Sequence, residues 1–242
     1  MKKLIKYIID KIFRKAQRNP MFYTFLKEKY FMNTNDHFML TLSFIKQQET
    51  TIPTIIDIGA ANGEFIEAIG IFFQKYNIIA YEPLDDFYNK INIKYYKHKN
   101  IKIYNSVVLD GREDIPFYRT NNNFSSSILS PDNISYENVK LDEVVTVSTR
   151  SLDEDTKDLS TIDLIKIDVQ GAEKTILEKN LTALKKTKYI LLEMSIEQQY
   201  NDGVLYHSLD KFLRENNFQL MSNFASYIGM PEFDALYKNN NI

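Results

Sequence analysis

The stretch Thr54-Ile-Ile-Asp-Ile-Gly-Ala-Ala-Asn-Gly-Glu-Phe65 joins a strand-like run to a helix-like run through a turn with two glycines. Residues 54–58 are all β-branched apart from Asp57, and three of them are isoleucine, as in a buried strand. Gly59 and Gly63 let the backbone approach a ligand closely, and the helix start offers free N–H groups. The glycines lack the G-x-G-x-x-G spacing of dinucleotide sites. We therefore expect either a nucleotide-type ligand without a pyrophosphate or a tight strand–helix turn with no ligand.

Strand-like and helix-like segments alternate along the rest of the chain. Apolar, β-branched runs predict strands at 54–58, 78–82, 101–108, 162–168, 188–194, 218–224 and 234–238. Helices are expected between them at 62–76, 84–98, 171–184 and 207–217. This alternation is typical of an α/β protein whose parallel sheet is covered on both faces. Residues 114–150 interrupt it with two strand-like runs around an Asn- and Ser-rich loop, which predicts an inserted antiparallel pair or edge element.

Acidic side chains stand at the carboxyl ends of three predicted strands: Asp57, Glu82 and Asp168. Ligands of open α/β sheets bind at these ends, so the three are expected to converge on one site. Glu82, followed by Pro83, can accept hydrogen bonds from two vicinal ribose hydroxyls. The alternative for Glu82 is a solvated carboxylate at a strand end.

The run Asp163-Leu-Ile-Lys-Ile-Asp-Val-Gln-Gly-Ala-Glu173 places a lysine inside an otherwise apolar strand. Strand alternation puts Lys166 and Asp168 on one face, close enough to share a partner or a ligand. A buried lysine is costly unless it is paired. Gly171 permits a tight exit from the strand, and Glu173 falls in the first turn of the next helix, where the helix dipole favours a negative charge. The alternative to a ligand site is a buried ion pair.

The composition excludes several classes of protein. The chain has no cysteine and three histidines among 242 residues, which excludes disulfides, a cysteine nucleophile and Cys-ligated metal, and argues against a His-rich metal site. We predict no metal site. The apolar runs are too short to span a membrane. With a net charge of −2, we expect a soluble, cytoplasmic protein.

Residues 1–19 carry seven basic side chains against Asp10 alone, a local charge of +6 that leaves −8 for the remainder. Their apolar residues recur at helical spacing. One interpretation is a basic amphipathic helix on the inner face of an anionic membrane or on a partner. The interpretation we favour is a helix on its own domain or in a homo-oligomer. With further amphipathic helices at 21–31 and 36–48, residues 1–50 form a helical N-terminal extension, and residues 51–242 form one domain.

The motifs DIGAANGEF, YEP, FSSSI, STRSLD and DLIKIDVQGAE, in this order, resemble those of the FkbM family of S-adenosylmethionine-dependent methyltransferases. The resemblance covers roughly residues 52–240. It implies a Rossmann-like class I methyltransferase fold with a seven-stranded, mostly parallel sheet whose last strand is antiparallel. It also implies methylation of hydroxyl oxygens, often on sugars or natural products. One departure is that Ala61 stands where the family's first motif usually has Asn, and Asn62 follows it.

The resemblance also implies which residues bind S-adenosyl-L-methionine and its acceptor. The methionine part would be held by Asp57, Gly59, Ala60, Ala61 and Gly63, the ribose by Glu82 next to Pro83, and the adenine by Asn105 and Ser106. Asp168 would face the methyl group and the incoming hydroxyl. The acceptor would be framed by the loop of Ser125, Ser126 and Ser127 and by residues 225–233 with Tyr227.

Methyl transfer to a hydroxyl needs alignment of the two groups and removal of the hydroxyl proton. The candidate bases are Asp168, which fits best by position and has Lys166 beside it, then Glu193 and His207. The expected acceptor is a small molecule or glycan. Alternatives are a non-sugar natural product, a nucleic acid or a protein as acceptor, or a non-catalytic α/β nucleotide-binding domain. The acidic remainder disfavours a nucleic acid as acceptor. The absence of a G-x-G-x-x-G motif disfavours an NAD-linked enzyme.

Overall fold

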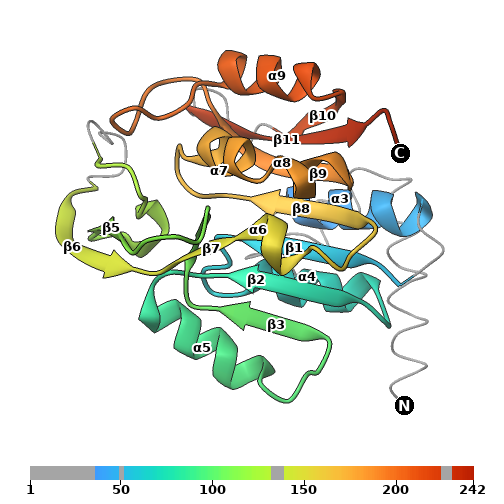
Figure 1. The fold of residues 1–242 in the computed structure, drawn as a ribbon, viewed down its shortest axis with the longest axis horizontal. Helices are drawn as coiled ribbons and strands as arrows, with labels where there is room; N and C mark the ends of the chain where they lie inside the picture. Colours follow the sequence, from blue (N-terminus) through green and yellow to red (C-terminus); the bar gives the residue numbers. More distant parts are fainter. Residues whose placement is uncertain (1–35, 49–51, 132–138, 225–230) are drawn as a thin grey trace, which may run out of the picture. The chain divides into compact units, whose positions relative to one another are not determined.

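The computed structural model describes residues 36–48, 52–131, 139–224 and 231–242 (Figure 1). Helix α3 (Asp36–Gln48) matches the helix predicted at 36–48. The helices predicted at 1–19 and 21–31, and the predicted acceptor residue Tyr227, lie outside the described residues. None of the described helices is both long enough and apolar enough to cross a membrane.

A seven-stranded sheet forms the centre of residues 40–242. Its strands follow one another in space in the order β10-β11-β9-β8-β1-β2-β3. Their bounds are β1 Thr54–Ile58, β2 Asn77–Tyr81, β3 Ile101–Tyr104, β8 Ile162–Ile167, β9 Thr187–Ser195, β10 Phe218–Phe224 and β11 Glu232–Asn239. β11 runs antiparallel to both of its neighbours, and the other pairs in this sheet are parallel. The structure thus confirms the mostly parallel sheet with an antiparallel last strand.

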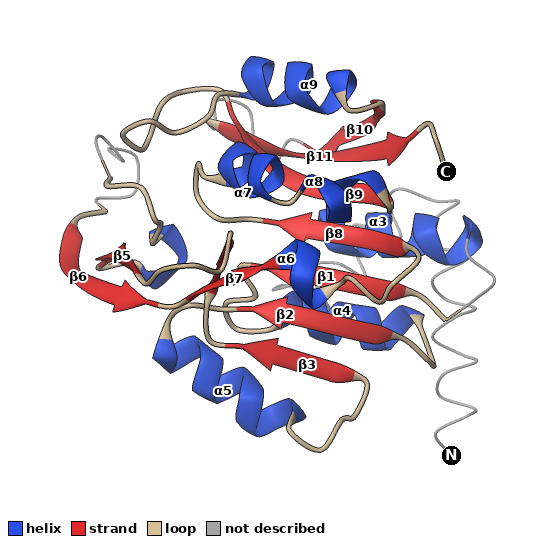
Figure 2. Cartoon of the chain, viewed as in Figure 1, coloured by secondary structure: helices blue, strands red, loops and turns tan. Residues whose placement is uncertain are grey.

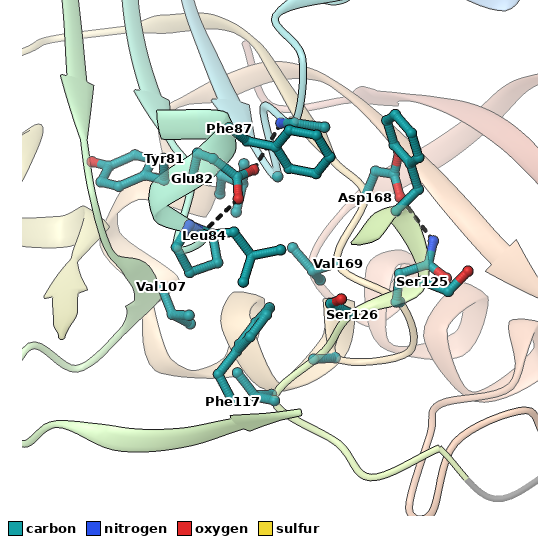
Figure 3. Close-up of a pocket in the computed structure, with 18 of the residues that line it drawn as sticks. Tyr81, Glu82, Leu84, Phe87, Val107, Phe117, Ser125, Ser126, Asp168 and Val169 are labelled. Atoms are coloured by element: carbon teal, nitrogen blue, oxygen red, sulfur yellow. Dashed lines mark hydrogen bonds between the residues drawn. The ribbon is translucent and has the colours of Figure 1, made fainter. Parts of the chain in front are cut away.

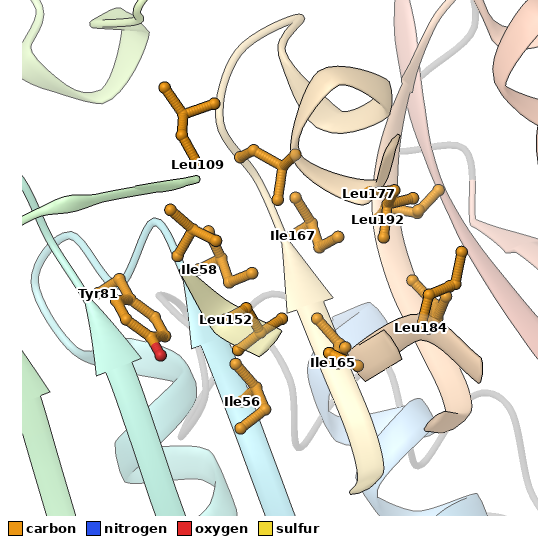
Figure 4. Packing of buried hydrophobic residues seen from close by; sticks show 14 of the residues in the cluster. Ile56, Ile58, Tyr81, Leu109, Leu152, Ile165, Ile167, Leu177, Leu184 and Leu192 are labelled. Carbon is orange, nitrogen blue, oxygen red and sulfur yellow. The ribbon is translucent and has the colours of Figure 1, made fainter. Parts of the chain in front are cut away.

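The two faces of the sheet have separate helical layers (Figure 2). On one face, a hydrophobic core contains apolar residues of four helices: α6 (Leu152–Asp155), α7 (Glu173–Lys179), α8 (Leu181–Lys185) and α9 (Tyr206–Glu215). They pack on alternate strand residues such as Ile58, Ile165 and Ile167 (Figure 4). Burying each of these side chains contributes roughly 1.5–3 kcal/mol. Helix α4 (Glu64–Phe72) and the C-terminal part of α3 cover the opposite face, where Phe44 contacts Tyr189 of β9.

An inserted segment separates β3 from β8. Strands β5 (Ile115–Thr120) and β6 (Leu141–Val147) pair antiparallel, which confirms the predicted inserted pair. Between them lies the short helix η1 (Asn123–Ser125). A second small sheet pairs β4 (Val107–Leu109) in parallel with β7 (Thr149–Ser151).

Two sequence predictions of continuous elements are wrong. The single strand predicted at 101–108 breaks into β3 and β4, because the Asn105 side chain leaves the sheet and donates to the carbonyl oxygens of Glu82 and Pro83. The single helix predicted at 171–184 is α7 followed by α8. It breaks at Asn180, whose side-chain amide donates to the carbonyls of Ile176 and Leu109.

Candidate active site

A cavity of about 260 Å³ opens at the carboxyl ends of β1, β2 and β8 (Figure 3). Residues after these strands form one wall, among them Gly59, Ala61, Glu82, Pro83 and Asp168. The inserted segment and helix α5 (Asp85–Tyr95) form the other, with Phe87, Phe117, Asn122, Asn123, Phe124, Ser125 and Ser126. The wall closes where Phe87 meets Phe124, with ring centroids 5.2 Å apart, and where Arg119 pairs with Asp86.

The turn after β1 requires glycine at both expected positions. Gly59 and Gly63 have φ angles of 80° and 79°, which residues with a side chain rarely adopt. A Cβ on Gly59 would overlap the carbonyl oxygen of Asp168, and one on Gly63 would lie 2.8 Å from Ile91. These glycines are therefore needed for the packing of the chain against itself. In particular, Gly59 lets the backbone of Asp168 lie close to the turn after β1.

The Glu82 carboxylate ties the turns after β1 and β2 together (Figure 3). It accepts hydrogen bonds from the backbone N–H of Ala61 (2.8 Å) and of Leu84 (2.9 Å). Its residue is only 4% exposed, so it is not a solvated carboxylate at a strand end. Burial raises the pKa of Glu82 to about 7, although the two backbone donors act in the opposite direction. Each carboxylate oxygen keeps a lone pair that can accept a ligand hydroxyl.

The buried Lys166 ammonium lies between two carboxylates. Its Nζ donates to the Gly59 carbonyl (2.7 Å) and lies 3.4 Å from Asp57 Oδ1 and 3.5 Å from Asp168 Oδ2. Burial acts to lower the pKa of Lys166, but Asp168 and Asp57 outweigh it and the pKa rises to about 12. Burial raises the pKa of Asp57 to about 6, opposed by Lys166. Asp57 balances the lysine charge beneath the cavity and is not one of its lining residues.

The carboxylate of Asp168 is 39% exposed at the cavity. Its Oδ1 accepts a hydrogen bond from Gln170 Nε2 (3.1 Å), and the same nitrogen donates to Glu193 Oε2 (2.8 Å). The structure therefore brings together Asp168, Lys166 and Glu193, three of the four predicted catalytic residues. His207 lies exposed on α9, outside the set of described residues that line the cavity.

Further carboxylates make this end of the cavity acidic. Glu193 and Glu232 line it, and Asp234 pairs with Glu193 across β9 and β11. Burial raises the pKa of Asp234 to about 7, and the nearby Asp168 raises it further. Burial, together with Asp168, Glu232 and Asp234, also holds the pKa of Glu193 well above its usual value. The electrostatic potential at this end of the cavity favours a positively charged ligand group. No set of three or more Asp, Glu, His or Cys side chains in the described ranges is arranged to hold a metal ion.

The remaining predicted residues occupy different places. Ser106 lines the cavity, is 1% exposed, and its hydroxyl has no hydrogen-bond partner among the described residues. Asn105 holds the Glu82–Pro83 turn. The Ala60 N–H donates to the Tyr81 carbonyl. Ser125 and Ser126 line the cavity, whereas the Ser127 hydroxyl donates to the carbonyls of Val169 and Gln170.

The sequence analysis did not predict three residues that line the cavity, Gln170, Phe87 and Phe124, or Tyr200, whose hydroxyl contacts the Gln170 side chain. Gln170 stands inside the quoted DVQG run, where its polar side chain next to a strand end was a usable signal. The two phenylalanines come from helix α5 and the inserted segment, and only the folded chain brings them together at the cavity.

Residues 57–220 match the family model of the methyltransferase FkbM domain. This chain belongs to the FkbM methyltransferase family. The 2-O-methyltransferase NoeI of Sinorhizobium fredii (strain NBRC 101917 / NGR234) is 26% identical over 201 residues, which cover 78% of this chain and 81% of NoeI.

Two solved methyltransferase structures share the fold. Streptococcus pneumoniae Sp1610, a candidate tRNA (m1A22) methyltransferase in complex with S-adenosyl-L-methionine, is 13% identical with a TM-score of 0.51, over 85% of this chain and 73% of that chain. The delta-N METTL16 MTase domain is 12% identical with a TM-score of 0.50, over 89% of this chain and 92% of that chain. The fold is that of class I methyltransferases.

The FkbM chain is thus a methyltransferase whose cofactor is S-adenosylmethionine, and the cavity fits this cofactor. The buried Ser106 hydroxyl without a partner offers a donor and acceptor at the end of β3. Glu82 offers carboxylate oxygens to the ribose hydroxyls, and the apolar wall around Phe87 and Phe124 offers surface to the adenine. The acidic end suits the positively charged sulfur.

Proposed function

We propose that this methyltransferase transfers the methyl group to a hydroxyl oxygen of a sugar or a related polyol. The observation that carries the proposal is the half-exposed carboxylate of Asp168 at the acidic end of the cavity, held by Lys166 and Gln170. The name of its relative NoeI, a 2-O-methyltransferase, describes a reaction at a hydroxyl oxygen.

The chain's own contribution to this reaction is to position the acceptor and take up its proton. Bound S-adenosylmethionine supplies a methyl group on a positively charged sulfur, which is a good leaving group. Asp168 accepts the hydroxyl proton as the oxygen forms its new bond to carbon, so the carboxylate ends protonated. The side chains of Phe87, Phe117 and Phe124 give this wall of the cavity an apolar surface.

The surroundings of Asp168 support an uncharged acceptor. Glu193, Glu232 and Asp234 lie close by, and the Lys166 charge is already shared by Asp57 and Asp168. A phosphate or carboxylate beside the reacting hydroxyl would add negative charge to a group of acidic side chains in which the pKa values of Glu193 and Asp234 are already raised. The cavity also offers the amide and hydroxyl groups of Asn122, Asn123 and Ser126, which suit the hydroxyls of a sugar.

The test incubates the protein with methyl-labelled S-adenosylmethionine and a panel of acceptors, with mass spectrometry as the readout. The panel holds neutral glycans, nucleotide-activated and lipid-linked sugars, non-sugar alcohols, tRNA and peptides. We expect label on a sugar oxygen whose neighbouring positions are uncharged. Label on nitrogen, on nucleic acid or on a peptide, with none on a sugar or polyol, would contradict the proposal.

The proposed location is the cytoplasm. The chain has no cysteine, in keeping with a reducing compartment. Fractionation of cells that produce the protein tests this, and recovery outside the cytoplasm would contradict it.

A further inference from the structure

We propose that Gln170 is a positioning residue, whose side-chain amide ties Asp168 to Glu193 and so fixes the direction of the Asp168 carboxylate. The inference rests on the proposed function, in which Asp168 takes the proton. Gln170 Nε2 lies 3.1 Å from Asp168 Oδ1 and 2.8 Å from Glu193 Oε2. Its two N–H groups match the two carboxylates, one each.

The backbone of Gln170 is held in an unusual conformation. Its φ of 60° lies in the left-handed region, where a residue other than glycine is strained. The segment is held on two sides. The buried Glu173 carboxylate accepts from the N–H of Val169 (3.3 Å) and Gly171 (3.1 Å), and the Ser127 hydroxyl donates to the Gln170 carbonyl (2.8 Å). The conformation directs the side chain between the ends of β8 and β9.

The side-chain amide has only one favourable orientation. Its Oε1 lies 2.8 Å from the hydroxyl of Tyr200, a residue that is 3% exposed, and that hydroxyl is also 2.8 Å from the Ser125 carbonyl. Turning the amide over would place its oxygen against two carboxylates and leave its N–H groups at Tyr200. The two carboxylates thus keep the donor side of Gln170 toward Asp168 and Glu193, and the Tyr200 hydroxyl, whose one proton faces both the Ser125 carbonyl and Gln170 Oε1, lies on the oxygen side.

Both oxygens of Asp168 are then engaged from within the protein. Gln170 contacts Oδ1 and Lys166 contacts Oδ2, which leaves the outward lone pairs directed at the cavity. The donated hydrogen bonds also allow two neighbouring carboxylates to share this space. Without Gln170, the Asp168 carboxylate would keep only the contact of its Oδ2 with Lys166, and Glu193 would lose the donor that this side chain supplies.

The test compares Gln170→Gly with wild type. Glycine adopts the left-handed backbone without strain, so this variant removes the amide and keeps the turn. Gln74→Ala, at an exposed glutamine between α4 and β2, is the matched control. We expect an unchanged melting temperature, unchanged affinity for S-adenosylhomocysteine, a roughly tenfold lower kcat, and an acidic limb of the kcat profile that moves to higher pH.

A second readout needs no acceptor. Carbon-13 NMR of the side-chain carboxyls follows the titration of Glu193, which faces Asp168, Glu232, Asp234 and Glu173 as well as Gln170. Loss of the amide donor should raise the pKa of Glu193 further. An unchanged Glu193 titration, or an unchanged kcat, in folded Gln170→Gly would overturn the proposal. If wild type methylates no hydroxyl, the proposed function fails, and the Glu193 titration still decides whether Gln170 ties these carboxylates.

Discussion

Lys166 on β8 and Asp57 on β1 are direct partners in the sheet, and their side chains form a buried ion pair with 3.4 Å between Nζ and Oδ1. The same ammonium donates to the Gly59 carbonyl and approaches Asp168. One side chain thus connects the turn after β1 to the end of β8. The lysine that looked anomalous in an apolar strand is paired, and its pairing shapes the floor of the cavity.

Lys166→Met should therefore destabilise the protein and weaken cofactor binding together. The substitution leaves Asp57 buried without its counter-charge, which typically costs about 3–5 kcal/mol. It also removes the hydrogen bond that the Lys166 ammonium donates to the Gly59 carbonyl. Urea unfolding and calorimetry with S-adenosylhomocysteine measure the two effects. Lys94→Met is the control, because Lys94 pairs with Glu67 on the surface and should change the free energy of unfolding by about 1 kcal/mol or less. Equal effects of both variants would contradict the role of Lys166.

If Glu82 binds the ribose hydroxyls, Glu82→Ala should weaken cofactor binding by roughly 2–4 kcal/mol, because two charge-assisted hydrogen bonds are lost. It should also lower the free energy of unfolding, since the N–H groups of Ala61 and Leu84 lose their acceptor. Calorimetry with S-adenosylhomocysteine and urea unfolding measure both, with the surface variant Glu64→Ala as control. Unchanged binding by a folded variant would leave Glu82 as a purely structural residue.

Ser106→Ala separates binding from folding more cleanly. The Ser106 hydroxyl is buried without a partner in the described part of the chain, so its removal should leave the free energy of unfolding unchanged or slightly raised. If the hydroxyl binds the cofactor, the affinity for S-adenosylhomocysteine should fall by about 0.5–1.5 kcal/mol. A variant with full affinity would show that the adenine lies elsewhere.

The sequence predicted the convergence of Asp57, Glu82 and Asp168, because the carboxyl ends of parallel strands meet at one edge of a sheet. It did not predict how these groups are satisfied. The sequence predicted only that the helix dipole favours a negative charge at Glu173, whereas the Glu173 carboxylate also accepts hydrogen bonds from the N–H groups of Val169 and Gly171. The contact of Gln170 with Tyr200 joins positions 30 residues apart. It depends on the course of a loop, which the spacing of apolar residues in the sequence does not predict.

The buried carboxyls predict an unusual pH dependence of stability. The pKa values of Asp57 (about 6), Glu82, Glu173 and Asp234 (each about 7) lie above their unfolded values. The folded state therefore binds more protons between about pH 4 and 7, and the free energy of unfolding should fall as the pH rises through this window. We expect greater stability at pH 5.5 than at pH 8 in urea unfolding.

Glu173→Gln provides the matched test of this pH dependence. The amide oxygen of glutamine can still accept from Val169 and Gly171, but it does not titrate. The slope of stability against pH should become smaller in this variant. A wild-type protein that gains stability from pH 5.5 to pH 8 would show that these carboxyls are ionised when buried, with their pKa values near those of the unfolded chain.

Asp168→Asn tests the proposed base directly. Asparagine is nearly isosteric, and Glu82 and Ser106, the residues we expect to contact the cofactor, are untouched, so the variant should fold and bind S-adenosylhomocysteine normally. Its kcat should fall by about 10²–10⁴, the usual contribution of a positioned general base. His207→Ala is the control, since His207 lies exposed on α9, and should keep full turnover. Near-normal turnover of Asp168→Asn at saturating acceptor would transfer the role to Glu193, for which Glu193→Gln is the next variant. Loss of cofactor binding or of the fold would instead make Asp168 part of the ion-pair network around Lys166. Chelator treatment of wild type distinguishes one more case: activity that is lost with chelator and restored by magnesium would make Asp168 a metal ligand.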